Sequence, residues 1–190
     1  MDKFSKLDRQ TGKIKEDTQD FKYYDEHVKI LDFEDWTIIE DRDAAVCIPY
    51  LIERNQIIVR SEYIPSYKYK DGQEYHLALI GGGIEKGETP NQAMIRELEE
   101  EGGIKLREDF NLEGLKPLFI SKGHANKYYP YIIELTEADY DLVTATGDGS
   151  KVEKMSKPIS IDAKQIHNLI PSDVITAYMI EVMKKYLTGQ

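Results

Sequence analysis

The stretch of sequence that decides the fold is GGGIEKGETPNQAMIRELEEEGGI, residues 81–104. Thr89 is a residue type that caps helices, the proline after it suits a first helical turn, and Gln92 completes a T-x-x-Q capping box. Two glycines at 102–103 are typical of a helix end. These signals predict a helix over residues 90–101, entered from a glycine-rich loop.

The predicted helix has two contrasting faces. Its apolar positions recur at spacings of three and four, and they are Met94, Ile95 and Leu98. That spacing gives a narrow stripe that we expect to hold the helix against a core. Glu97, Glu100 and Glu101 share the other face, so three negative charges meet within about one turn. Each like-charged pair at this spacing costs roughly 0.2–0.5 kcal/mol if it is merely solvated.

A cation would relieve this repulsion. Clustered carboxylates with no Cys or His beside them favour Mg²⁺ or Mn²⁺ over zinc, because hard oxygen ligands suit the first two ions. The glycines at 81–83 precede the helix by one short loop, where the absence of side chains lets backbone atoms approach a metal or a phosphate. The alternative is a solvated helix face without a ligand, as in many charge runs.

The spacing of the whole stretch favours the metal site. Gly82 is followed after five residues by Glu88, and after a further seven by the run RELEEEGGI that begins at Arg96. This stretch resembles the Nudix box, G-x5-E-x7-R-E-U-x-E-E-x-G-U with U an aliphatic residue, at every fixed position. The resemblance implies hydrolysis of a nucleoside diphosphate linked to another moiety, with a divalent metal ion as cofactor.

The resemblance also implies a role for each charged position of the box. The implied metal ligands are Glu97 and Glu101 as the main pair, Glu100 as support or as ligand to a second ion, and the carbonyl oxygen of Gly81. Glu88 and Arg96 are expected to pair and to orient the ligating carboxylates. The candidate catalytic residues of the box are therefore Arg96, Glu100 and Glu101.

Composition bounds the class of protein. At 190 residues the chain is long enough for one domain with a sizeable core. Its formal net charge of −10 argues against a nucleic-acid or membrane surface, so we expect a small substrate, and the Nudix resemblance implies that it is a nucleotide. The single cysteine, Cys47, lies in an apolar run and is expected to be a buried thiol. Because the chain shows no apolar leader and no apolar run of membrane-spanning length, we expect a cytoplasmic protein.

We divide the chain into an N-terminal strand extension, residues 1–43, and a main domain, residues 44–190. The extension contains two strand-like pieces, FKYYDEHVKILDF and DWTIIED, which are expected to lie against the main domain or a partner subunit. In the main domain, AAVCIPYLI and QIIVR bracket a turn. The run YKYKDGQEYHLALI is predicted to form a hairpin with its turn at Asp71 and Gly72.

Three further strand-like runs follow the box: PLFIS, YPYIIEL and KPISI. Asp162 is expected to open a short helix, and Ser172 to cap a terminal helix. The predicted apolar face of that helix consists of Val174, Ile175, Ala177, Tyr178, Met179, Val182 and Tyr186. Strands with few helices between them indicate an α+β fold with a mixed sheet, and the Nudix resemblance implies an α/β/α sandwich.

Beyond the box, residues 30–187 resemble the ADP-ribose pyrophosphatase branch of the family. The resemblance is carried by the N-terminal strands, the segment IIVRSEYIP, the strand that feeds the box and the helix entered through IPSDVITAY. It implies cleavage of ADP-ribose or a related ADP-sugar to AMP and a sugar phosphate. Two positions depart from it: Ile64 stands where a substrate-binding arginine is common, and Pro117 is the nearest candidate for a proline expected after the box.

The candidate substrate-binding residues are Arg60, in place of the missing guanidinium, with Tyr63, Lys122 and Tyr128. The last two belong to SKGHANKYYPY, residues 121–131, which combines lysines able to neutralise phosphate with tyrosines able to stack a base. Tyrosines at such positions also serve simply to pack a strand.

The proton acceptor is expected on a separate loop, because metal ions would occupy the helix carboxylates. TATGDGSKVEKMSK, residues 144–157, is glycine-containing and lies between two predicted strands. In the branch that the sequence resembles, a glutamate of the corresponding loop joins the site. Glu153 is the candidate here, and Asp148 is the other carboxylate of the loop. The alternative is a surface loop whose acidic residues take no part.

Other functions are compatible with the same residues. The substrate could be NADH, a dinucleoside polyphosphate, a deoxynucleoside triphosphate or capped RNA, or the chain could be a nucleotide-binding sensor without hydrolysis. The intact carboxylates of the box argue against the sensor, and the acidic composition argues against RNA. The ADP-ribose pyrophosphatase resemblance further implies a homodimer in which the N-terminal strands pack across subunits.

Overall fold

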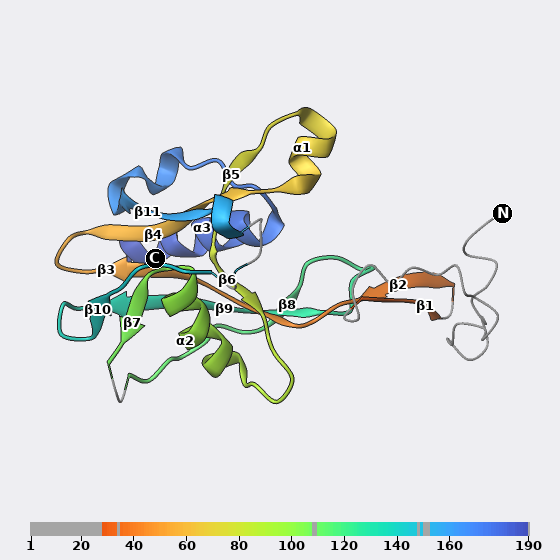
Figure 1. Cartoon of the computed structure of the whole chain (residues 1–190), viewed down its shortest axis with the longest axis horizontal. Coiled ribbons are helices and arrows are strands. Elements are labelled where there is room, and N and C mark those ends of the chain that lie inside the picture. Colours follow the sequence, from red (N-terminus) through yellow and green to blue (C-terminus); the bar gives the residue numbers. More distant parts are fainter. Residues whose placement is uncertain (1–27, 34, 108–109, 148, 150–152, 190) are drawn as a thin grey trace.

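A computed structural model of the chain describes residues 28–33, 35–107, 110–147, 149 and 153–189, with the backbone alone for residues 31–33 and 153. Figure 1 shows a central sheet with helices on both faces and a two-stranded arm that extends away from it. The fold is therefore α+β with a mixed sheet, as predicted.

Seven strands form the central sheet within the described residues, in the order β11-β4-β3-β9-β8, with β5 on β4 and β6 on β3. Their bounds are β3 Ala44–Leu51, β4 Gln56–Tyr63, β5 Tyr75–Ala78, β6 Ile80–Gly83, β8 Leu118–Phe119, β9 Lys127–Leu135 and β11 Lys157–Asp162. β3 and β9 pair parallel, whereas the other pairs are antiparallel. The strands predicted from PLFIS, YPYIIEL and KPISI are confirmed as β8, β9 and β11.

β3 is apolar on both faces because the sheet is covered on both sides. Ala45 and Cys47 belong to the core on the side of the helix that carries the box, whereas Val46 and Ile48 belong to the core on the opposite side. A strand buried on both faces reads as a continuous apolar run. The prediction of a buried thiol is confirmed, and burial raises the pKa of Cys47 well above its usual value.

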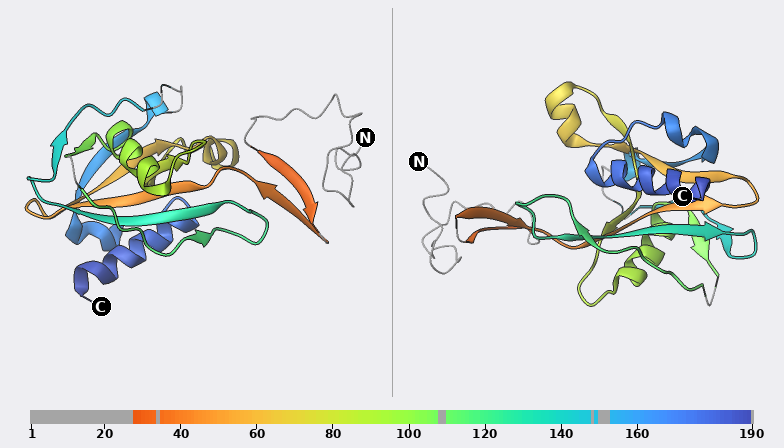
Figure 2. Two further views of the ribbon diagram at one scale, coloured as in Figure 1. Left: turned by 90° about the horizontal axis from the view of Figure 1, so that it is seen from below. Right: turned by 180° about the vertical axis from the view of Figure 1, so that it is seen from behind.

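The box helix is α2, Pro90–Glu100, and it packs on one face of the sheet, while the terminal helix α3, Val174–Thr188, packs on the other (Figures 1 and 2). Met94 and Leu98 of α2 are fully buried, as predicted. Ile95 is 41% exposed, so that part of the predicted stripe is wrong. Ile95 lies one turn before Glu99, which pairs with Lys105 at the surface, and Ala93 takes its place in the core.

The start and the buried face of α3 differ from the prediction. Asp173, and not Ser172, is the N-cap, because its carboxylate accepts a hydrogen bond from the Thr176 backbone N–H. The face that packs on the sheet consists of Ile175, Thr176, Met179, Ile180 and Met183. The prediction is wrong for Val174, Tyr178 and Tyr186, which are exposed because they lie on the side of the helix that turns away from the sheet.

The predicted hairpin turn at Asp71 and Gly72 is wrong. Residues Pro65–Asp71 form the short helix α1, and Gly72 ends it in the left-handed conformation with φ 73°. A proline in the first turn and a glycine after the last are helix-end signals as well as turn signals. The two flanking strands, β4 and β5, still pair antiparallel around the helix.

The arm consists of β1, Lys29–Phe33, and β2, Trp36–Glu40, which pair antiparallel. They confirm strands in the described part of FKYYDEHVKILDF and in DWTIIED. A second small sheet joins β7, Ile104–Leu106, to β10, Tyr140–Leu142, and was not predicted because each strand has only three residues.

Two short 3₁₀ helices complete the described structure. η2, Glu153–Met155, precedes β11, and η3, Ala163–Asn168, follows it with Asp162 as its cap. The short helix predicted to open at Asp162 is therefore confirmed. Among the described residues, none of the helices has the length and apolar character needed to cross a membrane.

Candidate active site

The candidate active site is the turn between β6 and α2 together with the last turn of α2. Thr89 caps the helix through the predicted box: its side chain accepts from the Gln92 backbone N–H at 3.3 Å, and the Gln92 side chain accepts from the Thr89 backbone N–H at 2.8 Å. The helix ends at Glu100, and the backbone N–H of Glu101 still donates to the Glu97 carbonyl at 2.8 Å. This fixed start and end place the carboxylates of α2 beside β6.

The glycines of β6 are required by close packing. A Cβ on Gly81 would lie 2.2 Å from the backbone oxygen of Ala45, and a Cβ on Gly82 would lie 2.3 Å from Oε1 of Glu97. Any larger residue at Gly82 would therefore push the Glu97 carboxylate out of its place. The strand and the helix approach closely enough for backbone and carboxylate to share one site.

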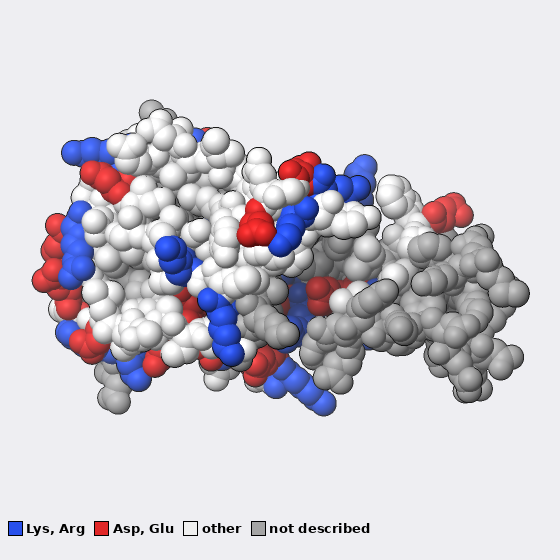
Figure 3. All heavy atoms as spheres, turned by 45° about the horizontal axis from the view of Figure 1, so that its top comes forward, with Lys and Arg blue, Asp and Glu red and all other residues white. Residues whose placement is uncertain are grey.

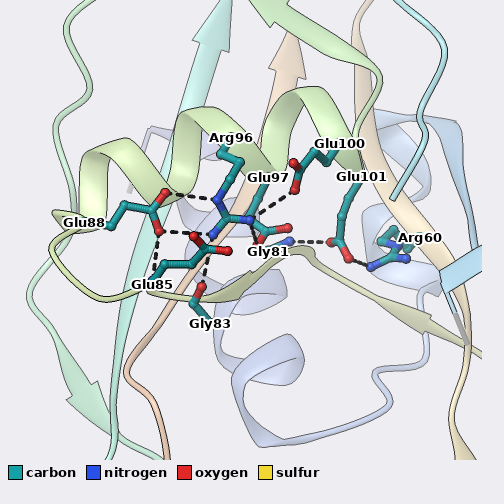
Figure 4. A network of polar contacts seen from close by, with 9 residues as sticks. All are labelled: Arg60, Gly81, Gly83, Glu85, Glu88, Arg96, Glu97, Glu100 and Glu101. Atoms are coloured by element: carbon teal, nitrogen blue, oxygen red, sulfur yellow. Dashed lines mark hydrogen bonds and ion pairs between the residues drawn. The ribbon is translucent and has the colours of Figure 1, made fainter. Parts of the chain in front are cut away.

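Arg96 gathers three carboxylates on one guanidinium group (Figure 4). It holds Glu88 bidentately, with Nε–Oε1 3.0 Å and Nη2–Oε2 3.1 Å. Its Nη1 donates to Oε1 of Glu97 at 2.6 Å and to Oε2 of Glu100 at 3.1 Å. Nη2 also donates to the Gly83 carbonyl at 3.1 Å, which ties α2 to β6. The expected Glu88–Arg96 pair is present, and the same arginine also contacts the two neighbouring carboxylates.

Arg60 forms a second ion pair at the other end of the cluster. Its Nη1 contacts Oε1 of Glu101, and the Gly81 backbone N–H donates to Oε2 of the same carboxylate at 2.9 Å (Figure 4). The side chains of Arg60 and Glu101 are 5% and 4% exposed. Nε of Arg60 is buried with no hydrogen-bond partner among the described residues. The predicted substrate-binding arginine therefore lies beside a predicted metal ligand, inside the protein.

The two arginines decide how the carboxylates are arranged. Among the described residues, no three His, Cys, Asp or Glu side chains converge as a ready-made metal site. Arg96 lies between Glu97 and Glu100, and Arg60 holds Glu101. The donor set nevertheless suits a hard cation: three carboxylates from one helical turn lie beside the backbone of Gly81. An ion would bind there by replacing part of the charge that the guanidinium groups now supply.

Burial and pairing move the carboxyl pKa values of the site in opposite directions. Burial raises the pKa of Glu97, and the hydrogen bond from Arg96 opposes that shift. The bidentate contact with Arg96 lowers the pKa of Glu88. Because burial makes the charge on Glu97 costly, a nearby cation would stabilise its ionised form.

A cavity of about 520 Å³ opens beside this cluster. The residues that line it are Val46, Glu62, Ala78, Leu79, Gly81, Ile120, Ser121, His124, Tyr128, Asp173, Val174, Ile175 and Thr176. Gly81 belongs both to this wall and to the contact with Glu101, so the cavity adjoins the carboxylate cluster. Tyr128, a predicted substrate-binding residue, lies in the wall, and burial raises the pKa of its hydroxyl.

The other predicted site residues lie apart from this cavity wall. Lys122 is exposed and lines a neighbouring hollow, which shares Ser121 and His124 with this cavity. Tyr63 makes an edge-to-face contact with Tyr75, with ring centroids 6.0 Å apart. The side chain of Glu153 and all of Asp148 lie outside the described residues.

Sequence reasoning missed Glu62 and Asp173 as cavity residues. Both lie within segments that the sequence singled out, Glu62 in IIVRSEYIP and Asp173 in IPSDVITAY, but the two segments are more than a hundred residues apart. Only the packing of the start of α3 against the sheet brings them to one cavity. A carboxylate at the first turn of the terminal helix signals a cap, which is the role that sequence can predict.

Comparisons with known proteins agree with the geometry. The model of the NUDIX domain matches residues 41–158. Diphosphoinositol polyphosphate phosphohydrolase 2 of Mus musculus and of Homo sapiens is 25% identical over 134 residues, covering 70% of this chain and 69% and 68% of those proteins. A crystal structure of an ADP compounds hydrolase has a TM-score of 0.58 at 18% identity, covering 86% of this chain and 85% of that chain. That last similarity shows a shared fold.

Proposed function

The chain belongs to the Nudix family and is a pyrophosphohydrolase, and we propose that it cleaves the diphosphate of ADP-ribose or a related ADP-sugar, giving AMP and a sugar phosphate. One observation carries the proposal: the box carboxylates of α2 and a cavity large enough for a sugar or nucleoside meet at Gly81. The fold shared with an ADP compounds hydrolase supports the choice of an ADP derivative.

The cofactor that we propose is Mg²⁺ or Mn²⁺, held by Glu97, Glu100 and Glu101 with the carbonyl oxygen of Gly81. A bound divalent ion would neutralise charge on the diphosphate and lower the pKa of an attacking water. Glu88 supports this arrangement through Arg96, because its bidentate contact fixes the guanidinium that in turn contacts Glu97 and Glu100.

Arg60 has two tasks in this proposal. In the absence of a cation it neutralises Glu101, as the buried ion pair shows. When Glu101 binds a cation, the guanidinium is free to donate to a phosphate oxygen of the substrate. The planar guanidinium group matches the spacing of phosphate oxygens and can donate two hydrogen bonds to them. Substrate binding by Arg60 therefore depends on release from Glu101.

Glu153 is the proposed general base. Two contacts of the backbone support this choice: the Tyr63 backbone N–H donates to the Ser156 side chain at 3.1 Å, and Pro158 lies opposite Arg60 in the pairing of β11 with β4. The segment that carries Glu153 is thereby tied to the strand that carries Arg60. Glu153→Gln is expected to lower kcat by roughly 10²–10⁴-fold with little change in KM. A loss of less than about tenfold, with a larger loss in Asp148→Asn, would move the role to Asp148.

The assembly that we propose is a homodimer formed through the arm. β1 and β2 extend from the sheet, and β2 holds to the main domain by two backbone contacts, Ile39 N–H to the Gly123 carbonyl at 2.8 Å and Ala125 N–H to the Ile39 carbonyl at 2.9 Å. Trp36 on β2 is 56% exposed. A two-stranded sheet with an exposed edge is commonly covered by a partner. Light scattering tests this: a mass of 21.9 kDa would contradict the dimer, and deletion of residues 1–40 should give monomers or insoluble protein.

A substrate panel tests the proposed reaction. Purified protein with Mg²⁺ is incubated with ADP-ribose, an ADP-hexose, NADH, a dinucleoside polyphosphate, a deoxynucleoside triphosphate, capped RNA and a diphosphoinositol polyphosphate. We expect the highest kcat/KM for ADP-ribose or the ADP-hexose, with AMP as a product in chromatography. A higher kcat/KM for any other member would replace the proposed substrate, and hydrolysis of none would refute the proposed function.

A further inference from the structure

Two carboxyl groups line the cavity beside the carboxylate cluster. Gly81 forms the wall next to Glu101, and Glu62 and Asp173 contribute carboxyl groups to the rest. Glu62 comes from β4, two residues after Arg60, and Asp173 comes from the start of α3 (Figure 1). A substrate that places its diphosphate at the cluster would place its next group among these carboxyls.

Glu62 is a hydrogen-bond acceptor that the protein leaves available. Its side chain is partly buried, and no residue that the structure describes donates a hydrogen bond to its carboxyl group. Arg60 attracts it at a distance, but the guanidinium contacts Glu101 instead. A carboxyl group that lines a cavity without a donor from the described residues is open to accept a hydrogen bond from a hydroxyl or an amine of a ligand.

Asp173 differs because the protein fixes its position. Its Oδ1 accepts from the Thr176 backbone N–H at 2.8 Å, and its Oδ2 accepts from the hydroxyls of Thr176 at 2.9 Å and Ser172 at 2.8 Å. Asp173 is itself exposed, but Thr176 and Ser172 are buried, and their three hydrogen bonds hold its carboxylate in the cavity wall. Asp173 is therefore a fixed negative charge that an incoming anion would meet.

We propose that this cavity binds a neutral, hydroxyl-bearing group attached to the diphosphate, and that Glu62 and Asp173 discriminate against substrates that carry a further phosphate on that group. The inference rests on the proposed function and deepens it, because it names the feature of the substrate that the chain selects. Hydroxyl groups donate to carboxylates, whereas a second anion brought between Glu62 and Asp173 is repelled. The cavity, with a volume of about 520 Å³, is large enough to hold a small polar group together with solvent.

The distribution of charge on the molecule is consistent with discrimination against a further phosphate. On the face that Figure 3 shows, Lys and Arg side chains are scattered among Asp and Glu and do not form a continuous basic patch. The chain as a whole carries a formal net charge of −10. A protein that takes a densely phosphorylated substrate benefits from gathered positive charge. The proposed ADP-sugar substrate carries fewer phosphates than the diphosphoinositol polyphosphates after which those relatives are named.

The test compares two ligands that differ by one phosphate: ADP-ribose and ADP-ribose 1″-phosphate. The Kd values of their α,β-methylene analogues are measured by calorimetry with the wild-type protein and Mg²⁺, because the P–CH₂–P bridge of these analogues cannot be hydrolysed. We expect the ADP-ribose analogue to bind at least about tenfold more tightly. Glu62→Gln keeps the size of the side chain and removes the charge, and we expect the ratio of the two Kd values to fall below about threefold. Asp173→Asn retains a good helix cap and should also lower the ratio of the two Kd values.

Glu113→Gln is the matched control, because Glu113 is exposed and lies outside this cavity. It should leave the ratio at its wild-type value. Equal affinity of the wild type for both ligands, no binding of either, or an unchanged ratio in Glu62→Gln would each overturn the inference. The proposed hydrolysis is decided separately by release of AMP with Mg²⁺, so failure of the reaction and failure of the selection are distinguishable.

Discussion

The two arginines that contact the carboxylates of α2 lie in different surroundings. Arg96 comes from the same helix, is partly exposed, and shares its guanidinium among Glu88, Glu97 and Glu100. Arg60 comes from β4, is buried, and contacts Glu101. This shared, partly exposed arginine is fixed by its bidentate contact with Glu88 and orients Glu97 and Glu100 through one hydrogen bond each. A buried arginine with one partner acts as that partner's counter-charge, because an unpaired charge at such a site is costly.

The difference between the two arginines indicates which carboxylate contact a bound cation would disturb. Glu97 and Glu100 each contact Arg96 through one oxygen, so each keeps its other oxygen for a metal while the arginine stays in place. Glu101 has its two oxygens on Arg60 and on the Gly81 backbone N–H. A metal at Glu101 would therefore compete with Arg60 for the carboxylate, whereas a metal at Glu97 and Glu100 could bind while Arg96 keeps its contacts.

The largest effect is expected from Glu101→Gln. The substitution keeps the shape of the side chain but removes the charge that a metal and Arg60 share. Turnover of ADP-ribose should fall on the order of 10³-fold, which corresponds to several kcal/mol of transition-state stabilisation. Release of AMP at saturating substrate measures this. Glu99→Gln on the same helix is the control and should keep near-normal turnover, since Glu99 pairs with Lys105 at the surface. Near-normal turnover in Glu101→Gln would assign the chemistry to other residues.

Arg60→Met removes the buried ion pair between Arg60 and Glu101. It leaves Glu101 buried without its counter-charge, and the free energy of unfolding in EDTA should fall by about 3–5 kcal/mol. Urea unfolding measures the loss. Mg²⁺ should recover part of it, because a bound cation stabilises the folded state.

The control for Arg60→Met is Arg107→Met, which removes an exposed pair with Asp141. It should cost less than about 1 kcal/mol, with or without Mg²⁺. Equal losses in the two variants would show that burial does not distinguish Arg60.

Arg96→Gln removes the guanidinium that three carboxylates share. Loss of the group that orients three carboxylates should lower kcat/KM by about 10–100-fold and raise the Mg²⁺ concentration for half-maximal activity. Arg96→Lys should recover little of this, because an ammonium group cannot hold Glu88 bidentately. If Arg96→Gln leaves the Mg²⁺ concentration for half-maximal activity unchanged, Arg96 does not orient the metal-binding carboxylates.

The smallest effect concerns pH and Glu88. Arg96 lowers the pKa of Glu88 from its usual 4.5, so the pair stabilises the fold at pH values above 4.5. That contribution is lost as the pH falls below 4.5 through the folded-state pKa. Relative to Glu88→Gln, the wild type should be about 1 kcal/mol more stable at pH 7 and should lose this advantage towards pH 3. Urea midpoints across that range measure it, and a difference independent of pH would contradict the ion pair.

The same contrast separates what sequence could predict from what it could not. The capping box, the helix near residues 90–100 and the Glu88–Arg96 pair depend on spacings within the box, so local rules sufficed. The Arg60–Glu101 contact joins residues 41 positions apart, and the pairing of strands determines it. A pattern within one element carries no information about that partner.

The errors in the predicted elements have the same cause. Asp71 and Gly72 fit a hairpin turn and a helix end equally well, and the packing of Tyr67 on His76, with ring centroids 3.9 Å apart, accompanies the helix. Ile95 and Tyr178 satisfy an apolar period, but which part of a helix faces the sheet is fixed by tertiary contacts. The cavity carboxyls were missed because two distant segments form them.

The most direct test of the central claim, that the carboxylates of α2 act through a divalent cation, is chelation of the wild-type protein. ADP-ribose hydrolysis is followed by release of AMP with Mg²⁺, after addition of excess EDTA, and after Mg²⁺ is restored above the chelator. The account predicts that turnover falls to the background of the Glu101→Gln variant in EDTA and returns fully with Mg²⁺. Turnover in EDTA that stays near the Mg²⁺ rate would contradict it.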